Sequence, residues 1–169
     1  IGIFVLPFSC RGHACSLPSE EMTISNNTVT GFTYGIRASK QKSIELSGNT
    51  LTSVPAIALW VSESWPSATV TITGNDLRNA TDTALRVGGV DARPDLGTGI
   101  RLTLTGNTFD GSRTGASLDS IQGPFTLSHT NTFANTGYIG STPLRISGKD
   151  VTVDGWSFSS TNAGGIGIF

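Results

Sequence analysis

The residues with the clearest capacity for chemistry lie in two insertions of a 169-residue chain. One insertion contains Trp65, and the other contains Asp91, Arg93 and Asp95. Two aspartates can supply the acid and the base that glycoside hydrolysis usually requires. A tryptophan ring can stack on the apolar face of a sugar, while an arginine binds hydroxyl or carboxylate groups. Asp91 and Asp95 are therefore our catalytic candidates, and Trp65 and Arg93 are substrate-binding candidates.

The same segment also allows a simpler interpretation. Asp91, Arg93, Pro94 and Asp95 would form a solvated turn with a local ion pair, because Asp and Pro are favoured in turns. Exposed ion pairs of this kind contribute little to stability or binding. Spacing along a loop does not give the distance between two carboxylates, so both interpretations stay open.

A phrase that the chain repeats six times predicts the elements that position these residues. In each full copy, apolar and polar residues alternate before a Gly-Asn or Asn-Asn pair, and another apolar residue follows. Alternation with a period of two is typical of a strand with one buried face. Gly and Asn tolerate the positive φ that a sharp corner needs. The full copies cover residues 22–29, 44–51, 70–77 and 102–109, and looser copies cover 125–133 and 151–158.

The spacing of the repeats predicts an all-β solenoid. A second apolar element follows each corner, and repeats of about 20–50 residues are typical of solenoids, propellers and arrays. We predict one domain over residues 1–169, with about seven coils whose equivalent strands pair in parallel about 4.8 Å apart. Stacked coils would align five asparagines in a ladder of amide hydrogen bonds. These are Asn27, Asn49, Asn75, Asn107 and Asn131, with steps of 22, 26, 32 and 24 residues.

The strand–Asn–strand repeat over residues 22–169 resembles the right-handed parallel β-helix of the pectin lyase-like superfamily. The handedness also agrees with the general preference for right-handed crossovers. In this superfamily, pectate and pectin lyases use an Arg base, with clustered Asp residues for calcium in the pectate enzymes. Polygalacturonases use an Asp cluster, and alginate epimerases carry an Asp-Pro-His-Asp motif. The chain has no tight acidic cluster and no epimerase motif, so no catalytic residue carries over from these enzymes.

Two features place further candidates on one side of the solenoid. Insertions at residues 7–21, 62–68 and 88–99 each follow the second strand of a coil, so they would wall a groove on one flank. An outward row on the second strands could follow an acidic polysaccharide, although surface salt bridges with Asp82 and Asp119 would explain it equally. The predicted row is Arg37, Ala58, Arg86, Ser117 or Asp119, and Arg145, of which Arg86, Asp119 and Arg145 are substrate-binding candidates.

The first strands carry a different outward pattern, rich in Thr and Ser. It resembles the Thr-x-Thr arrays of β-helical ice-binding proteins, but Thr is also a favoured residue on a solvent-facing strand. Glu45 and Asp154 interrupt the pattern. Inside the coils, Phe109, Phe133 and Phe158 occupy equivalent positions and are predicted to stack.

Cys10 and Cys15 lie between Pro7 and Pro18. A local disulfide in an exported protein is the interpretation that we favour. Free thiols, or a metal site that also uses His13, are the alternatives. We expect no metal and no cofactor, because no fourth ligand is evident.

The composition of the chain limits the kinds of partner that we expect it to bind. A net charge of −1 argues against nucleic acid, which generally requires a basic face. No apolar run approaches the ~20 residues of a membrane helix. Residues 1–4 and 166–169 share the sequence Ile-Gly-Ile-Phe, which leads us to expect a longer β-helix at both ends, or a homotrimer that covers them.

Three functional hypotheses follow. The resemblance implies an extracellular β-helix that recognises or processes a polysaccharide, as a relative of lyases or hydrolases, with catalysis unproven. The alternative is a noncatalytic structural or adhesive module on a virion or cell surface, such as the shaft of a tail spike. Ice binding through the Thr-rich face is the third.

Overall fold

The computed structural model describes residues 1–5, 19–39, 41–62, 67–88, 98–137 and 142–154. Over these ranges the chain forms strands, turns and bends, without a helix. Consequently, this part of the chain has no helical segment with the length and hydropathy to span a membrane. The predicted insertions 62–68 and 88–99 and the C-terminal copy of the repeat fall partly outside these ranges. Of the insertion 7–21, residues 19–21 belong to a strand.

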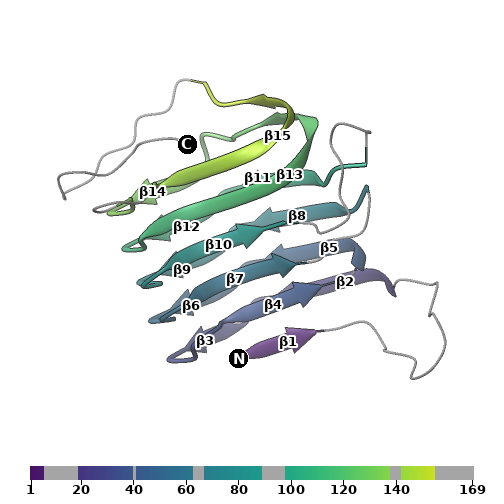
Figure 1. The fold of residues 1–169 in the computed structure, drawn as a ribbon. Coiled ribbons are helices and arrows are strands. Elements are labelled where there is room, and N and C mark those ends of the chain that lie inside the picture. Colours follow the sequence, from purple (N-terminus) through teal and green to yellow (C-terminus); the bar gives the residue numbers. More distant parts are fainter. Residues whose placement is uncertain (6–18, 40, 63–66, 89–97, 138–141, 155–169) are drawn as a thin grey trace.

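Three parallel sheets run along one axis, and each coil from β2 to β13 contributes one strand to each sheet (Figure 1). Sheet A lies in front in this view. Its strands, in spatial order, are β1 (Ile3–Val5), β4 (Ile36–Ser39), β7 (Ile57–Ser62), β10 (Thr83–Val87), β13 (Thr114–Thr126) and β15 (Leu144–Thr152).

Sheets B and C complete the coils. Sheet B has the spatial order β11 (Arg101–Thr105), β8 (Thr69–Thr73), β5 (Gln41–Ser47) and β2 (Ser19–Ser25). Sheet C has the order β14 (Thr132–Ala134), β12 (Thr108–Asp110), β9 (Asp76–Arg78), β6 (Thr50–Thr52) and β3 (Thr28–Thr30). Neighbouring strands always come from successive coils, so the fold is a parallel β-helix, as the repeat predicted.

The corner between sheets B and C follows the repeated phrase. Each strand of sheet B ends one residue before a corner residue with positive φ, and the ladder asparagine comes next. The corner residues are Asn26, Gly48, Gly74 and Gly106, with φ of 58°, 62°, 63° and 66°. Glycine adopts this conformation without a steric cost, and asparagine adopts it more readily than most residues.

The asparagine ladder is present and almost wholly buried. The Nδ2 atom of Asn49 donates to Oδ1 of Asn75 at 3.0 Å, and Asn75 donates to Asn107 at 2.9 Å. Asn27 joins at one end and Asn131 at the other, each at 3.0 Å. The same Oδ1 atoms accept the backbone N–H groups of the preceding asparagines at 3.0–3.1 Å. The ladder therefore satisfies polar groups that the corner would otherwise leave unpaired in the core.

The space between the three sheets is filled by apolar side chains in columns. Phe109 and Phe133 stack with their ring centroids 4.6 Å apart, as their equivalent positions predicted, while Phe158 lies outside the described residues. Where four of the coils enter sheet A, small residues form a second column, which consists of Gly35, Ala58, Ala84 and Gly115. A Cβ on Gly35 would lie 2.5 Å from a methyl carbon of Leu51, and one on Gly115 would lie 2.8 Å from the ring of Phe133. Large side chains from sheet C therefore fill the space beside the small ones.

Ala58 belongs to this inner column, and its predicted outward position is wrong. Its side chain is completely buried, because Ile36 pairs with Leu59 rather than with Ile57. This register places Ala58 beside Gly35, where only a small side chain fits.

Replacing the central ladder residue should destabilise the whole β-helix. Asn75 makes five side-chain hydrogen bonds, to Leu46, Thr73, Asn107 and twice to Asn49. Asn75→Ala would leave several buried groups unsatisfied, so we expect a loss of about 3 kcal/mol in the free energy of unfolding, measured by urea denaturation. Asn27→Ala is the matched control at the end of the ladder and should cost only about 1 kcal/mol. Equal losses of unfolding free energy at the two positions would contradict the expectation that the buried centre of the ladder contributes most to stability.

Candidate functional site

The structure describes three of the seven predicted catalytic and binding residues. Asp91, Asp95, Arg93 and Trp65 lie outside the described residues, as do Cys10, Cys15 and His13. Arg86, Asp119 and Arg145 lie on the outer face of sheet A, where the sequence predicted them. The described residues end at Ser62, the last residue of β7, and at Gly88, directly after β10, and these neighbouring strands of sheet A pair in register at Val61 and Val87.

One outward row crosses all six strands of sheet A. Each member pairs in register with the next, so the row runs along the helix axis with one side chain per coil. The row spans five steps, or about 24 Å at the usual strand separation. Its members, from β1 to β15, are Phe4, Arg37, Trp60, Arg86, Ser117 and Arg145.

Aromatic and cationic side chains alternate in the first part of this row. The guanidinium carbon of Arg37 lies 4.1 Å from the ring centroid of Trp60 and 5.2 Å from that of Phe4. Arg86 lies on a neighbouring strand, 5.8 Å from Trp60. These separations fall within the range of cation–π attraction. Tyr34 adds a tilted ring contact, with its centroid 5.9 Å from that of Trp60.

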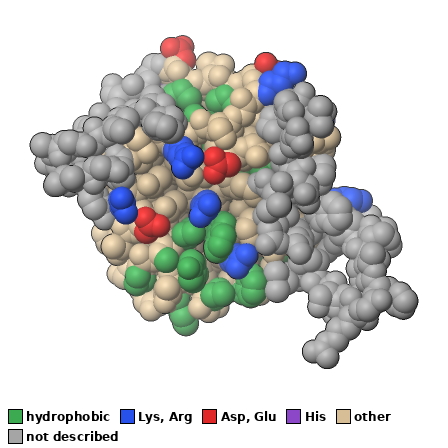
Figure 2. Space-filling model, viewed as in Figure 1, with side chains coloured by type: hydrophobic (Ala, Val, Ile, Leu, Met, Phe, Trp, Pro, Cys, Tyr) green, Lys and Arg blue, Asp and Glu red, His purple; other side chains and the backbone are tan. Residues whose placement is uncertain are grey.

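Arg37 is held in place by a further contact. Its Nε donates to Oγ of Ser62 at 3.2 Å, and Ser62 is almost fully buried. The guanidinium is thus oriented between two rings. The side chains of Trp60 and Arg37 are half-buried, whereas Phe4 is exposed, at 43% of its surface. Figure 2 shows hydrophobic side chains gathered on the lower part of this face, with basic and acidic groups among and above them.

Polar side chains occupy the upper part of the face. Asp119 accepts a hydrogen bond from Oγ of Ser147 at 3.2 Å. The ion pairing of the arginine row by Asp82 and Asp119 is not found among the described residues, because neither carboxylate has a basic group within 4 Å there. The row therefore presents guanidinium groups beside aromatic rings and one carboxylate.

Trp60, Phe4 and Tyr34 are the residues that the sequence analysis missed on this face. A usable signal existed. The first inward-facing residue of each sheet A strand follows the ladder asparagine of its coil at a nearly constant distance. The distance is nine residues for Ile36 and ten residues for Leu59 and Leu85. That spacing would have aligned Trp60 with Arg37.

The outer face of sheet B carries the Thr-rich pattern in two registered ranks. Charged side chains interrupt the array. Glu45 stands between Thr23 and Thr71, and Arg101 pairs with Thr69 at the edge. The ranks are Thr23–Glu45–Thr71–Thr103 and Ser25–Ser47–Thr73–Thr105.

Sheet C carries an exposed ion pair, which belongs neither to the row on sheet A nor to the Thr-rich ranks on sheet B. Nε of Arg78 lies 2.6 Å from Oδ1 of Asp76. The hydrogen bond and the charge of Asp76 raise the pKa of Arg78 above its usual value. Because this guanidinium is solvent-exposed and already charged, the shift has no consequence for binding.

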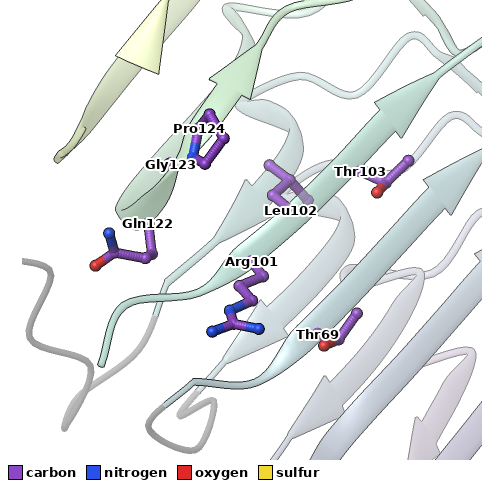
Figure 3. Close-up of a pocket in the computed structure, with 7 residues that line it drawn as sticks. All are labelled: Thr69, Arg101, Leu102, Thr103, Gln122, Gly123 and Pro124. Atoms are coloured by element: carbon purple, nitrogen blue, oxygen red, sulfur yellow. The ribbon is translucent and has the colours of Figure 1, made fainter. Parts of the chain in front are cut away.

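A cavity of about 460 Å³ opens beside sheet B, at the edge of β11 (Figure 3). Its walls come from β11 and the second half of β13, which run side by side, with Thr69 of β8 at one edge. The lining residues are Thr69, Arg101, Leu102, Thr103, Gln122, Gly123 and Pro124.

The described part of the chain was compared with the side-chain groupings that hold metal ions. No group of three or more His, Cys, Asp and Glu side chains comes together there. His129 lies exposed, with its Nε2 atom 2.8 Å from the carbonyl oxygen of Asp154.

Comparison with known proteins gave no match: no protein family, no curated protein and no solved structure is significantly similar to this chain. The structure therefore defines the class of the protein by itself. It is an all-β parallel β-helix with an internal asparagine ladder and an aromatic–arginine row on its outer surface.

The stacking of Arg37 on Trp60 should be measurable as a coupling energy. In a double-mutant cycle with Arg37→Met and Trp60→Leu, we expect a coupling of about 0.5–1 kcal/mol from urea denaturation. The pair Arg86 and Trp60, separated by 5.8 Å, is the control and should give a smaller value. A coupling indistinguishable from zero for the closer pair would show that the contact is not energetically significant.

Proposed function

We propose that this protein is a carbohydrate-binding β-helix that recognises a polysaccharide along the outer face of sheet A. The observation that carries the proposal is the row from Phe4 to Arg145, which places one side chain per coil and in which aromatic and guanidinium groups alternate from Phe4 to Arg86. The resemblance of the repeat to the pectin lyase-like superfamily supports the same assignment. It remains an analogy at the level of the fold.

The chemistry of the row suits sugars. An aromatic ring offers an apolar surface for the C–H face of a pyranose. Guanidinium groups donate paired hydrogen bonds to hydroxyl, carboxylate or sulfate oxygens, and Asp119 can accept from hydroxyl groups. Because the row extends across six strands, it suits an elongated polymer better than a single small molecule.

Catalysis is a separate question within this proposal. Asp91 and Asp95 remain our candidates for a general acid and a general base, and Trp65 and Arg93 remain candidates for binding beside them. If these residues act on the bound chain, the enzyme would be a polysaccharide lyase or a glycoside hydrolase. An extracellular, cell-surface or virion location would fit either a binding module or an enzyme.

The second function that an observation favours is a noncatalytic shaft or adhesin. Ile1, Phe4 and Phe32 are exposed at 43–51%, near the first coil of the β-helix. Exposed apolar side chains that lie together favour association with another protein surface. A homotrimer or a continued β-helix would cover them. Ice binding receives less support, since Glu45 divides one of the two hydroxyl ranks.

A polysaccharide binding screen tests the proposal. The purified protein would be applied to an array of neutral, uronate-rich and sulfated polysaccharides, while reducing ends and 4,5-unsaturated products are followed. We expect binding to acidic polymers that Trp60→Ala and Arg86→Ala each weaken about tenfold or more, because each removes one step of the row. Release of product that Asp91→Ala or Asp95→Ala abolishes would add the enzyme assignment.

Thr73→Ala is the matched control, since Thr73 lies on the outer face of sheet B, away from the row. It should leave binding unchanged. The proposal fails if no polysaccharide binds, or if Trp60→Ala and Arg86→Ala bind as well as the wild type. A stable trimer without sugar binding would support the shaft instead.

A further inference from the structure

We infer that the cavity beside β11 is a second binding site, and that it accepts a small hydroxylated carboxylate such as a sugar acid. The site lies beside sheet B, and the second half of β13 forms one of its walls, whereas the row that carries the proposed function crosses the first half of β13 at Ser117. It would exist whether or not sheet A binds a polysaccharide.

The cavity forms where regular strand pairing stops. The second half of β13 runs beside β11, and the two segments share one bridge, between Ile100 and Ile121. The backbone N–H of Gln122 donates to the carbonyl of Ile100 at 2.7 Å. Two residues further along, the next donor of this ladder would be the N–H of residue 124. Residue 124 is proline, which has no N–H, so the pairing cannot continue.

The interruption leaves a backbone acceptor at the cavity. Along β11, the carbonyl of Thr105 accepts from Gly74 on the side of β8, whereas the carbonyl of Leu104 faces the other side and accepts from Asn131. Carbonyls alternate in direction along a strand. The carbonyl of Leu102 therefore faces the same side as that of Leu104, toward Pro124. It needs a hydrogen-bond donor that Pro124 cannot supply.

The side chains around the cavity have unused hydrogen-bonding capacity. Arg101 has neither an ion pair nor a side-chain hydrogen bond among the described residues. The Oε1 atom of Gln122 is buried and accepts no hydrogen bond there. Arg101 projects between Gln122 on one side and Thr69 on the other, and Thr103 lies two residues further along β11 (Figure 3). None of the seven lining residues is acidic.

These groups are complementary to a ligand that combines a carboxylate with hydroxyl groups. The guanidinium of Arg101 pairs best with a carboxylate, because its fork of N–H groups matches two oxygens. The carbonyl of Leu102 requires a donor, which a hydroxyl group supplies. The ring of Pro124 and the aliphatic part of Leu102 add apolar surface for C–H groups. A hydroxylated carboxylate meets all of these requirements.

The neighbouring coil reinforces the preference for an anion. Lys149 of β15 pairs in register with Gln122, and its side chain is exposed. Arg101 and Lys149 thus flank Gln122, about 10 Å apart along the axis of the β-helix. The cavity volume also falls in the range of small-molecule sites.

Isothermal titration calorimetry with matched acid and neutral probes tests this site. The acids are glucuronate, galacturonate and gluconate, and their neutral counterparts are glucose, galactose and sorbitol. We expect at least one acid to bind tenfold or more tightly than its neutral partner, and to weaken as salt is added. Arg101→Gln should lower its affinity tenfold or more. Gln122→Glu should do the same, because it places a negative charge beside the ligand.

Two control variants separate this site from other effects. Arg78→Gln makes the same change at an exposed arginine of sheet C and should leave affinity unaltered. Trp60→Ala should also leave affinity unaltered, even if it abolishes polysaccharide binding, so the two sites can fail independently. Thermal unfolding of each variant would confirm that the fold is retained.

The source of the ligand is tested with oligosaccharides that carry the acid either at an end or internally. Binding of the free acid and of the end-bearing oligosaccharide supports the site in either case, and their relative affinities identify the source. The inference is overturned if no acid binds more tightly than its neutral counterpart, or if Arg101→Gln binds as the wild type does.

Discussion

The asparagine ladder is the constraint on which the rest of this structure depends. Each ladder residue is separated from the next by a different length of chain, from 22 to 32 residues. Yet the three central residues, Asn49, Asn75 and Asn107, make the same set of bonds. The amide of each donates to the next asparagine and to a buried backbone carbonyl, and its oxygen accepts the backbone N–H of the preceding asparagine. Buried polar groups are costly when unpaired. The ladder therefore returns every coil to the same register, however many residues the coil contains.

Fixed register determines what each face of the solenoid can present. Because strands in successive coils are aligned residue to residue, a side chain on one strand has neighbours at about 4.8 Å on both sides. On sheet A this alignment places Arg37 between Phe4 and Trp60, and a shift of one residue would turn these side chains toward the core. On sheet B the same alignment produces ranks of hydroxyl groups. The faces differ in chemistry although one backbone pattern generates both.

The parallel β-helix, the corners and the ladder could be predicted from the sequence because they are encoded locally. Alternation at period two, a residue that tolerates positive φ and a recurring asparagine all lie within eight residues. The row on sheet A was predicted only in part. Arg37, Arg86 and Arg145 were placed correctly, but Trp60 was missed because Ala58, two residues earlier, looks equally outward in a short apolar strand. Only the packing of Ala58 in the small-residue column beside Gly35 separates the two.

The cavity beside β11 could not have been predicted in this way. It depends on Pro124 lying opposite Leu102, which are 22 positions apart in the chain and belong to different coils. Nothing near either residue marks the contact. The candidates Asp91, Asp95, Arg93 and Trp65 lie outside the described residues, so they stay predictions.

The row on sheet A combines an even spacing with an uneven composition. Phenylalanine, arginine, tryptophan, arginine, serine and arginine follow one another at equal intervals. A uniform row would let a periodic polymer slide by one unit at no cost in free energy. Here a shift by one coil exchanges aromatic and cationic contacts between Phe4 and Arg86, so a bound chain would have one preferred alignment along the axis.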